Sequence, residues 1–191
     1  AMLPQFGLRV SIMLDANGAN TTAAAAVRAA ARHATLEDSS VLVLGGTGPV
    51  GQRVARLLAR EGAQVRLASR QQARAAAACH AIDGNADLAT ALEGRSIVVA
   101  AGAAGVVLLP RSARDACKTL KVAIDLNAVP PLGIEGVNVT DKGVEHEGVI
   151  CYGAIGVGDT KMKVHKAAVA ALFDRNDQVL DAEEIYALAQ Q

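Results

Sequence analysis

The 191-residue sequence has very few aromatic side chains: they make up 2% of it, and tryptophan is absent. Proteins that bind single-stranded nucleic acids stack the bases on aromatic side chains, so the composition excludes a platform of that kind. The 19 basic and 19 acidic residues give a formal net charge of zero, and no global field would collect nucleic acid or an anionic membrane. We expect neither partner, and any phosphate binding must be local.

Cysteines and long apolar runs are also scarce. Cys79, Cys117 and Cys151 are odd in number and lack the paired spacing of metal ligands, so we expect no disulfide framework and no metal site. Every apolar run is interrupted by glycine, proline or charge before it reaches the length that crosses a bilayer, and the first residues lack the pattern of a secretory signal. The sequence thus predicts a cytoplasmic protein.

The order of apolar and helix-forming segments predicts an α/β fold. Strands are expected at residues 41–44, 64–68, 97–101, 122–126 and 149–152, and helices at 49–61, 71–81, 160–173 and, after an Asp181 cap, 181–189. Strands that alternate with helices form a parallel sheet, so we predict a Rossmann-type parallel sheet with helices on both faces. Earlier in the chain, residues 8–14 are a candidate strand, and residues 23–34 a candidate helix with Asn20, Thr21 and Thr22 as candidate N-caps.

A glycine-rich turn joins the strand at 41–44 to the helix at 49–61. It satisfies the G-x-G-x-x-G pattern in the strand–turn–helix context that binds dinucleotides, with the residues Gly46, Thr47, Gly48, Pro49, Val50 and Gly51. The first glycine permits the tight turn, the second lets the backbone approach a pyrophosphate, and the third lets helix and strand pack closely. Unpaired amides at the helix start would hold the phosphates. The alternative is a glycine turn without a ligand.

The end of the second strand predicts which dinucleotide is bound. An acidic residue there normally accepts hydrogen bonds from the ribose hydroxyls of NAD and repels the 2′-phosphate of NADP. Here the strand is followed by Ser69 and Arg70, a hydroxyl and a guanidinium that suit a phosphate dianion. We predict NADP(H) as the cofactor, with NAD as the second candidate. In the alternative interpretation, Arg70 only caps a solvated helix.

Several further motifs follow one another in a fixed order. They are SIMLDANGANTT at residues 11–22, GTGPVG at 46–51, DLNAVPPLGI at 125–134, TDKG at 140–143, GAIG at 153–156, KMKVH at 161–165 and DAEEIY at 181–186. Together they resemble the methylene-tetrahydromethanopterin dehydrogenases of methylotrophic bacteria, and the likeness runs from Phe6 to the C-terminus. Several separated motifs are far more specific than one glycine turn.

The resemblance implies an enzyme of one-carbon metabolism that oxidises methylene-tetrahydromethanopterin, or methylene-tetrahydrofolate, to the methenyl form with NAD(P)+. It also implies a division of the chain. Residues 1–38 would be a strand and helix that lead from a largely absent substrate domain, residues 39–173 the NADP-binding Rossmann domain, and residues 174–191 a C-terminal helix that packs back on the interdomain region. The expected partners are a reduced pterin or folate carrier and further copies in a homo-oligomer.

The implied chemistry needs orientation of two rings rather than acid–base catalysis. The hydride leaves a carbon flanked by two nitrogens, which share the resulting positive charge, so no proton needs to move in that step. The protein must align the rings and tolerate positive charge at the bridge carbon. In an open α/β sheet the ligand lies beyond the carboxyl ends of the strands, which makes the loops at 45–51, 100–105, 127–133 and 153–161 the candidate site.

Small residues in these loops would let the cofactor lie against the backbone. Besides the glycine turn, Ser69 and Arg70, the candidate cofactor-binding residues are Ala101, Gly102, Ala103, Asn127, Gly153, Ala154, Ile155 and Lys161. The resemblance places Asp15, Asn17 and Lys161 at the reacting end. Lys161 is expected to open the late helix as a ligand contact; alternatively it is a solvated lysine. Asp15 either counters the developing positive charge or caps the turn before Gly18.

Two other functions remain open. A shikimate-dehydrogenase-like oxidoreductase would share this architecture, and Asn20, Thr21 and Thr22 are similar to the Asn-Thr-Asp opening of that family, without its acidic third residue. From a different class, the chain would be an NADP-binding module that performs no catalysis on its own because its substrate part is missing.

Overall fold

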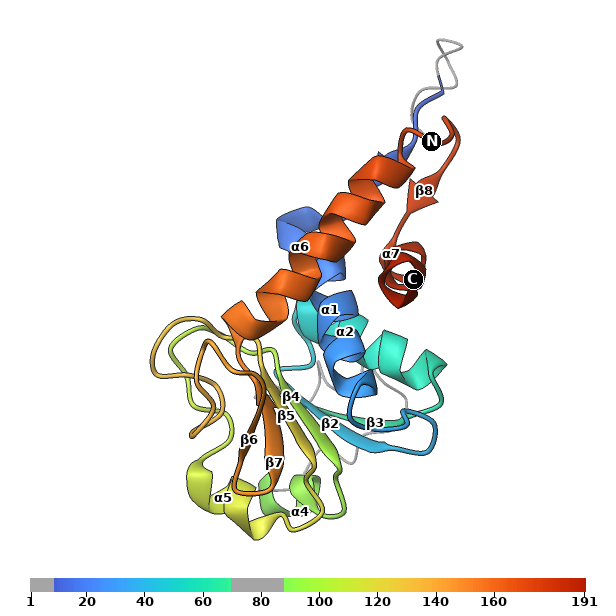
Figure 1. Cartoon of the computed structure of the whole chain (residues 1–191). Helices are drawn as coiled ribbons and strands as arrows, with labels where there is room; N and C mark the ends of the chain where they lie inside the picture. Colours follow the sequence, from blue (N-terminus) through green and yellow to red (C-terminus); the bar gives the residue numbers. More distant parts are fainter. Residues whose placement is uncertain (1–8, 70–87) are drawn as a thin grey trace.

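The computed structural model describes residues 9–69 and 88–191 (Figure 1). The predicted helix at 71–81 and Arg70 lie outside the described residues. A six-stranded sheet with the order β3-β2-β4-β5-β7-β6 forms the centre of the molecule. Its parallel strands are β2 (Ser40–Leu44), β3 (Gln64–Ala68), β4 (Ile97–Ala100), β5 (Val122–Asp125) and β7 (Val149–Tyr152). All five predicted strands are confirmed, each to within one residue at either end.

The edge strand β6 (Lys142–His146) was not predicted from the sequence. It pairs antiparallel with β7, and its register shifts between Lys142 and Val144. Its sequence, KGVEH, lacks the alternation of apolar and polar residues that indicates a strand, and none of its side chains is fully buried. Its position is decided by β7, with which it forms a hairpin closed by Glu147 and Gly148, both at positive φ.

Helices cover both faces of the sheet, as predicted. On one face, α1 (Ala19–Ala31), α2 (Pro49–Arg60), α6 (Ala154–Ala171) and α7 (Ala182–Gln190) form one apolar core with alternate residues of the central strands, such as Val41, Val43 and Val99. On the other face, the short helices α4 (Leu88–Leu92) and α5 (Arg111–Ala116) pack with Leu42 and Val98. The central strands are apolar on both sides because both sides are covered.

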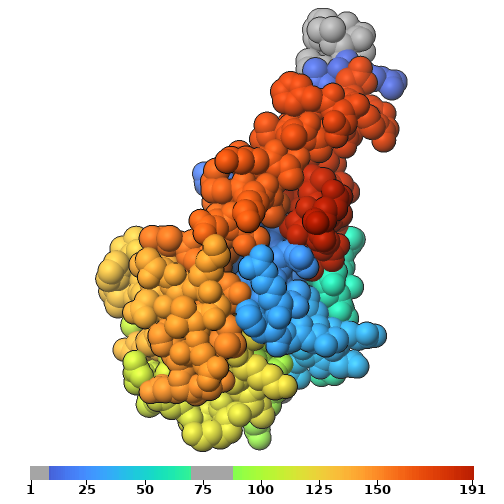
Figure 2. All heavy atoms as spheres, in the orientation of Figure 1, coloured from blue at the N-terminus to red at the C-terminus, as the bar shows by residue number. Residues whose placement is uncertain are grey.

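A second, two-stranded parallel sheet lies at the far end of α6. It pairs β1 (Ile12–Met13) with β8 (Val179–Leu180), so that the first described residues meet the segment after α6. Ser11 Oγ donates to the carbonyl of Arg175 (2.6 Å) and accepts from the amide of Gln178 (3.1 Å). Figure 2 shows α6 and this tip as an arm that projects from the body of the molecule. Of the strand predicted at 8–14, the described residues contain only β1.

The predicted N-cap is correct for α7 and wrong for α1. Asp181 caps α7 as predicted, and Glu184 completes a capping box with it. The helix predicted from residue 23 is α1, which begins at Ala19 with Gly18 as its N-cap, so the prediction of Asn20, Thr21 and Thr22 as caps is wrong. These three residues lie in the first turn of α1 instead. The carboxylate that caps the helix is that of Asp15, which accepts hydrogen bonds from the amides of Asn20 and Thr21. Of the helices in the described ranges, none is long and apolar enough to cross a membrane.

Candidate functional site

The glycine turn lies where the order of the strands reverses direction. From β2 the chain passes to β3 on one side and returns to β4 on the other, and Leu44 pairs with Ala68 in β3 and with Ala100 in β4. The carboxyl ends of three neighbouring strands are therefore level at this point. In open α/β sheets a ligand binds in the crevice outside such a reversal.

Two glycines of this region are required by close packing of the backbone. A Cβ on Gly51 would lie 2.7 Å from the Cα of Gly46, so α2 can approach the turn only because residue 51 has no side chain. Gly45 has a φ of +71°, and its Cβ would lie 2.4 Å from the Cα of Gly102 in the loop after β4. These glycines are explained by the fold itself.

Gly48 has no such explanation. Its backbone is extended (φ −77°, ψ 166°), a conformation that any residue can adopt, and the nearest atom to its Cβ would be the carbonyl oxygen of Gly45 at 3.6 Å. A Cβ here would make only ordinary van der Waals contacts, so the fold does not require a glycine before α2, whose N1 residue is Pro49. The first amides of a helix have no partner within the helix, and at the start of α2 they coincide with the positive end of the helix dipole. The arrangement suits a phosphate that approaches the backbone.

A pocket of about 920 Å³ opens at this point, a volume within the range of small-molecule sites. Thr47, Gly48 and Pro49 of the turn form its floor, together with Ala68 and Ser69 after β3. The described residues that complete its lining are Leu44, Gly45, Leu88, Ala91, Ala101, Gly102, Ala103, Val106 and Leu108. The pocket thus combines residues from three loops that the sequence analysis proposed separately.

Ser69 lies in this pocket beside the glycine turn. Its hydroxyl is 3.1 Å from the hydroxyl of Thr47, which links the end of β3 to the turn. The end of β3 carries no carboxylate at Ala68 or Ser69, and the amides of Gly45 and Gly46 both donate to the carbonyl of Ala68 (2.9 and 3.1 Å). Arg70, the other residue predicted to contact the ribose phosphate, lies outside the described residues.

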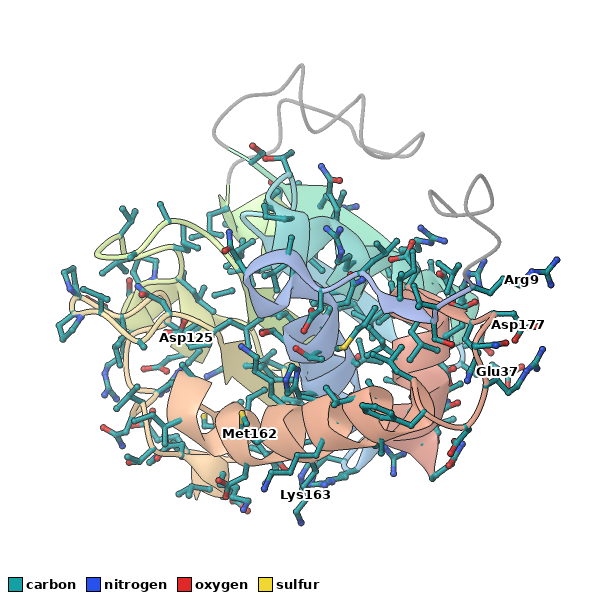
Figure 3. The ribbon with its side chains drawn as sticks, turned by 90° about the horizontal axis from the view of Figure 1, so that it is seen from above. Arg9, Glu37, Asp125, Met162, Lys163 and Asp177 are labelled. Carbon is teal, nitrogen blue, oxygen red and sulfur yellow. The ribbon has the colours of Figure 1, made fainter. Side chains whose placement is uncertain are left out.

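The loop after β5 is organised by Asp125, which the sequence analysis did not single out. Its carboxylate accepts hydrogen bonds from the amides of Asn127 (3.0 Å) and Ile134 (2.8 Å), and only a glycine fits at residue 133, where a Cβ would lie 2.8 Å from Asp125 Oδ1. Burial raises the pKa of Asp125, against the opposing effect of these amides. Asp125 is the last residue of β5 and is labelled in Figure 3.

Asn127 has its side-chain amide engaged within this loop. Its oxygen accepts from the amide of Val129 (3.0 Å), and its nitrogen donates to the carbonyl of Pro131 (3.2 Å). Asn127, predicted as a cofactor contact, lies at the carboxyl edge of the sheet but is not among the described residues that line the pocket. Its local role is to shape the loop.

The segment after β7 is helical, and the prediction of a loop at 153–161 is wrong. Gly153 is the N-cap of α6, and Ala154 and Ile155 form its first turn. The amide of Ile155 donates to the carbonyl of Val139 (2.8 Å), so this helix start is closed by protein, unlike that of α2. None of the three residues is among the described residues of the pocket lining. The glycines of this segment lower the helix propensity, which is why the sequence suggested a later start.

A second group of polar residues lies where the middle of α6 meets the short 3-10 helix η2 (Ala16–Gly18). Lys161 is the eighth residue of α6 rather than its first, and its Nζ would be 2.6 Å from a Cβ on Gly18. No hydrogen bond or ion pair of this half-buried ammonium is found within the described part of the chain. Asn17 is exposed and has a φ of +54°. The structure thus brings Asn17 and Lys161 to the same end of the molecule.

Asp15 belongs to this group and caps α1. Its Oδ1 accepts from the amides of Asn20 (2.8 Å) and Thr21 (3.0 Å), and its Oδ2 accepts from the hydroxyl of Thr21 (2.8 Å). The Nδ1 of His165, one helical turn after Lys161, lies 3.8 Å from Oδ2. The side chain of Asp15 therefore caps the helix after Gly18 rather than the turn before it, which is closed by a backbone bond from the amide of Gly18 to the carbonyl of Asp15 (2.9 Å).

Asn20 and Arg53 connect this second group to the glycine turn, a link that the sequence analysis missed. Asn20 is 1% exposed; its amide donates to the carboxylate of Asp181 (2.9 Å), and its oxygen accepts from Arg53 Nε. Arg53 also donates to the carbonyl of Pro49 (2.8 Å), the first residue of α2. The sequence signal that could have indicated this network is a polar asparagine at the start of an alanine-rich helix.

Among the described residues, the thiols and potential metal ligands form no further site. Burial raises the pKa of Cys151 to about 11, so its thiol stays protonated and unreactive. Cys79 lies outside the described residues. Across residues 9–69 and 88–191, no group of three or more histidine, cysteine, aspartate or glutamate side chains is arranged to hold a metal ion.

No protein-family model matches the sequence, but two curated proteins of Methylorubrum extorquens do. The chain is 43% identical to the bifunctional protein MdtA in an alignment of 198 positions that covers 96% of the chain and 69% of that protein. It is 30% identical to an NAD(P)-dependent methylenetetrahydromethanopterin dehydrogenase in an alignment of 207 positions that covers 93% of the chain and 68% of that protein.

Two solved structures share the fold at low sequence identity. A transhydrogenase from Sinorhizobium meliloti has a TM-score of 0.62 with 22% identity and 90% of the chain covered. An L-alanine dehydrogenase has a TM-score of 0.54 with 16% identity and 81% of the chain covered. The chain spans about half the length of each, 52% and 53%. These likenesses show the Rossmann-type fold.

Proposed function

Because the chain belongs to the methylenetetrahydromethanopterin dehydrogenase family, we propose that it is an NAD(P)-dependent dehydrogenase, with NADP as its preferred cofactor and a methylene-tetrahydropterin as its substrate. The observation that carries this proposal is a glycine in the pocket lining that the fold does not require. Gly48 stands at the start of a helix and lines the pocket of about 920 Å³, and a phosphate that approaches its backbone explains the missing side chain.

The residues that line the pocket suit such a cofactor. The amide of Thr47 and the first amides of α2 would bind the pyrophosphate, since the amide of Gly48 itself donates to the carbonyl of Gly45 (3.2 Å). The small residues Ala101, Gly102 and Ala103 would admit the adenosine and ribose. When bound, the nicotinamide supplies the acceptor for the hydride of the substrate. The chain itself binds and orients the two rings.

The preference for NADP is supported by the end of β3. Ser69 lines the pocket where NAD-specific domains carry a carboxylate, and Arg70 follows it in the sequence. A hydroxyl and a guanidinium attract a 2′-phosphate, which a carboxylate would repel. The assignment of Ser69 and Arg70 to the 2′-phosphate is based on the sequence.

The reacting end of the site is assigned to the group at η2 and α6. The ammonium of Lys161 lacks a protein acceptor in the described part of the chain, and we assign it the binding of an acceptor atom on the pterin. Asn17, exposed at the tip of η2, offers a second amide contact. Asp15 holds the segment in place, because its oxygens are bonded to α1. The reaction needs no proton transfer in the hydride step, and no residue is assigned as a general base.

The activity is tested by NADP+ reduction with methylene-tetrahydromethanopterin, methylene-tetrahydrofolate and shikimate as separate substrates. The assay is run on the 191-residue chain and on the longest reading frame that contains it. Turnover of a methylene carrier is the expected result. Turnover of shikimate alone would contradict the proposal, and cofactor binding without turnover by either protein would favour a binding module.

The cofactor preference is tested by titrating NADP+ and NAD+ into Ser69→Asp and Arg70→Asp variants. We expect each to lose NADP+ affinity relative to NAD+ by about tenfold or more, because a new carboxylate repels the 2′-phosphate. Ser112→Asp makes the same chemical change as Ser69→Asp at an exposed position of α5. This matched control should leave the ratio of the two affinities unchanged. An unchanged ratio in the two test variants would remove the preference for NADP.

A further inference from the structure

Arg53 is a half-buried cation of α2 for which the described part of the chain supplies no carboxylate within ion-pair distance. Arg56, three residues later on the same helix, forms an ion pair with Glu183. Arg53 instead donates to two neutral oxygens, the carbonyl of Pro49 (2.8 Å) and the side-chain oxygen of Asn20. A cation near the amino end of a helix is not favoured by the helix dipole. The position of Arg53 is therefore fixed by these two hydrogen bonds rather than by an ion pair.

Asn20, the acceptor of Arg53 on α1, is buried and uses its whole side-chain amide. Its nitrogen donates to the carbonyl of Leu14 and to the carboxylate of Asp181 (2.9 Å), and its oxygen accepts from Arg53. A buried polar atom that loses its partner has given up water without compensation, and Asn20 is only 1% exposed. Asn20 therefore needs the bond from Arg53, and a displacement of one residue is expected to disturb the other.

The two side chains join the two ends of the site by holding backbone carbonyls. Pro49 lines the cofactor pocket, and Arg53 binds its carbonyl. Leu14 precedes Asp15 and the helix η2, and Asn20 binds its carbonyl. The helices that carry the two side chains, α1 and α2, pack against each other in one layer (Figure 1). Neither side chain is among the described residues of the pocket lining, so each acts on a ligand through the backbone that it holds.

We propose that Arg53 is a positioning residue that couples the cofactor site to the reacting end. A phosphate bound at the start of α2 restricts the backbone at Pro49, and the restricted Arg53 holds Asn20 and the segment before η2 in one position. The second ligand then meets a segment that is already ordered, and each ligand tightens the binding of the other by the same factor. This inference rests on the proposed function and adds a coupling between its two ligands.

The test measures hydrogen exchange of the backbone amides at residues 14–22, with and without saturating ligand. The ligands are NADP+ and 2′-phospho-ADP-ribose, which has the pyrophosphate but no nicotinamide that could contact η2. Both should slow this exchange by about fivefold or more in the unmodified chain. Arg53→Met should lose the protection while its Kd for NADP+ stays within about threefold of the unmodified value. Arg53→Lys, whose ammonium can still bind an acceptor oxygen, should keep part of the protection.

The second readout is the Kd of methenyl-tetrahydromethanopterin, measured with and without saturating 2′-phospho-ADP-ribose. The ratio of the two constants should be about fivefold or more in the unmodified chain and close to one in Arg53→Met. A merely structural defect would change both constants and leave their ratio as it was. Arg56→Met is the matched control, because it removes an arginine of the same helix that binds Glu183 instead. It should keep both the protection and the ratio.

Thermal midpoints show whether each variant is folded, and Arg53→Lys carries the comparison if Arg53→Met is not. If the unmodified chain binds NADP+ without a change of exchange at residues 14–22, or if the folded Arg53 variants keep the full protection, the assignment of Arg53 is wrong while the proposed function stands. Equal loss of protection in Arg56→Met would also overturn it, because general loosening of α2 would then be the cause. If neither ligand binds the unmodified chain, the proposed function fails and this inference fails with it.

Discussion

At the scale of single residues, the glycines of the turn between β2 and α2 have different surroundings. Gly51 lies against the backbone of Gly46, whereas Gly48 faces the open pocket. Replacement by alanine is therefore expected to affect mainly folding at Gly51 and mainly ligand binding at Gly48. This separation distinguishes a ligand site from a glycine turn that serves the fold alone.

Gly51→Ala should lower the free energy of unfolding by about 1–3 kcal/mol, because the new methyl group overlaps the Cα of Gly46. Gly48→Ala should change it by less than about 0.5 kcal/mol while weakening NADP+ binding by about tenfold or more. Urea unfolding and calorimetric titration measure the two quantities. Unchanged NADP+ affinity in Gly48→Ala would contradict the assignment of the phosphate site.

The buried carboxyl of Asp125 leads to a pH-dependent prediction. Burial raises its pKa above the ordinary value of 3.8, so the folded chain holds the proton more tightly than the unfolded chain. The contribution of this group to stability is present below about pH 3.8 and is lost as the pH rises through the raised pKa. The difference in unfolding free energy between wild type and Asp125→Asn should therefore decrease with rising pH, as measured by urea unfolding at several pH values. An increase over this range would show that the amide bonds to the carboxylate dominate.

At the scale of elements, α1 depends on a cap that lies outside its own first turn. Asp15 binds two amides and one hydroxyl of this helix and has only 8% of its side chain exposed. Asp15→Ala should lower the free energy of unfolding by about 1–2 kcal/mol. Asp15→Asn keeps one acceptor oxygen and should lose less. Equal losses in chemical denaturation would show that the charge, rather than the cap geometry, stabilises the segment.

The start of α6 illustrates how packing overrides local propensity. Three glycines between residues 153 and 158 disfavour a helix, yet the helix begins at Ala154. Gly153 and Gly156 are required there because their Cβ atoms would overlap carbonyl oxygens of residues 138–141. Contacts with a segment distant in the sequence thus extend the helix by six residues beyond the predicted start.

At the scale of the whole molecule, the alanine-rich helix α1 lies in the centre of a helical layer. It contacts α2, α6 and α7, and its alanines from Ala23 to Ala26 are fully buried. Small side chains let three helices approach one backbone, which accounts for the alanine bias of this segment. The bias therefore reflects tertiary packing as well as helix propensity.

Enlarging one of these alanines should disturb all three contacts. Ala26→Leu is expected to lower the free energy of unfolding by about 1–3 kcal/mol, because the tightly packed layer cannot take up the added volume. Ala167→Leu, at an exposed position of α6, should change it by less than about 0.5 kcal/mol. Urea unfolding of the two variants measures the difference. Equal stabilities would mean that the layer around α1 is loosely packed.

The sequence alone determined the elements whose signals are local. Short apolar runs, and in β3 an alternation of apolar and polar residues, predicted the five parallel strands. The glycine turn predicted the β2–α2 junction, and Asp181 predicted the start of α7. Each of these depends on residues within a few positions of one another. The same is true of the order of elements, from which the parallel sheet follows.

Only the tertiary structure decided which distant residues share a site. It placed Ser69 beside Thr47 in one pocket, brought Lys161 to Gly18 across more than a hundred residues, and gave the capping of α1 to Asp15. The tertiary structure also distinguished the glycines whose Cβ atoms would overlap other atoms from Gly48 and Gly158, whose Cβ atoms would not. The physical reason is that close approach, burial and unfilled space are properties of pairs of segments, and a single stretch of sequence does not encode the segment that will lie against it.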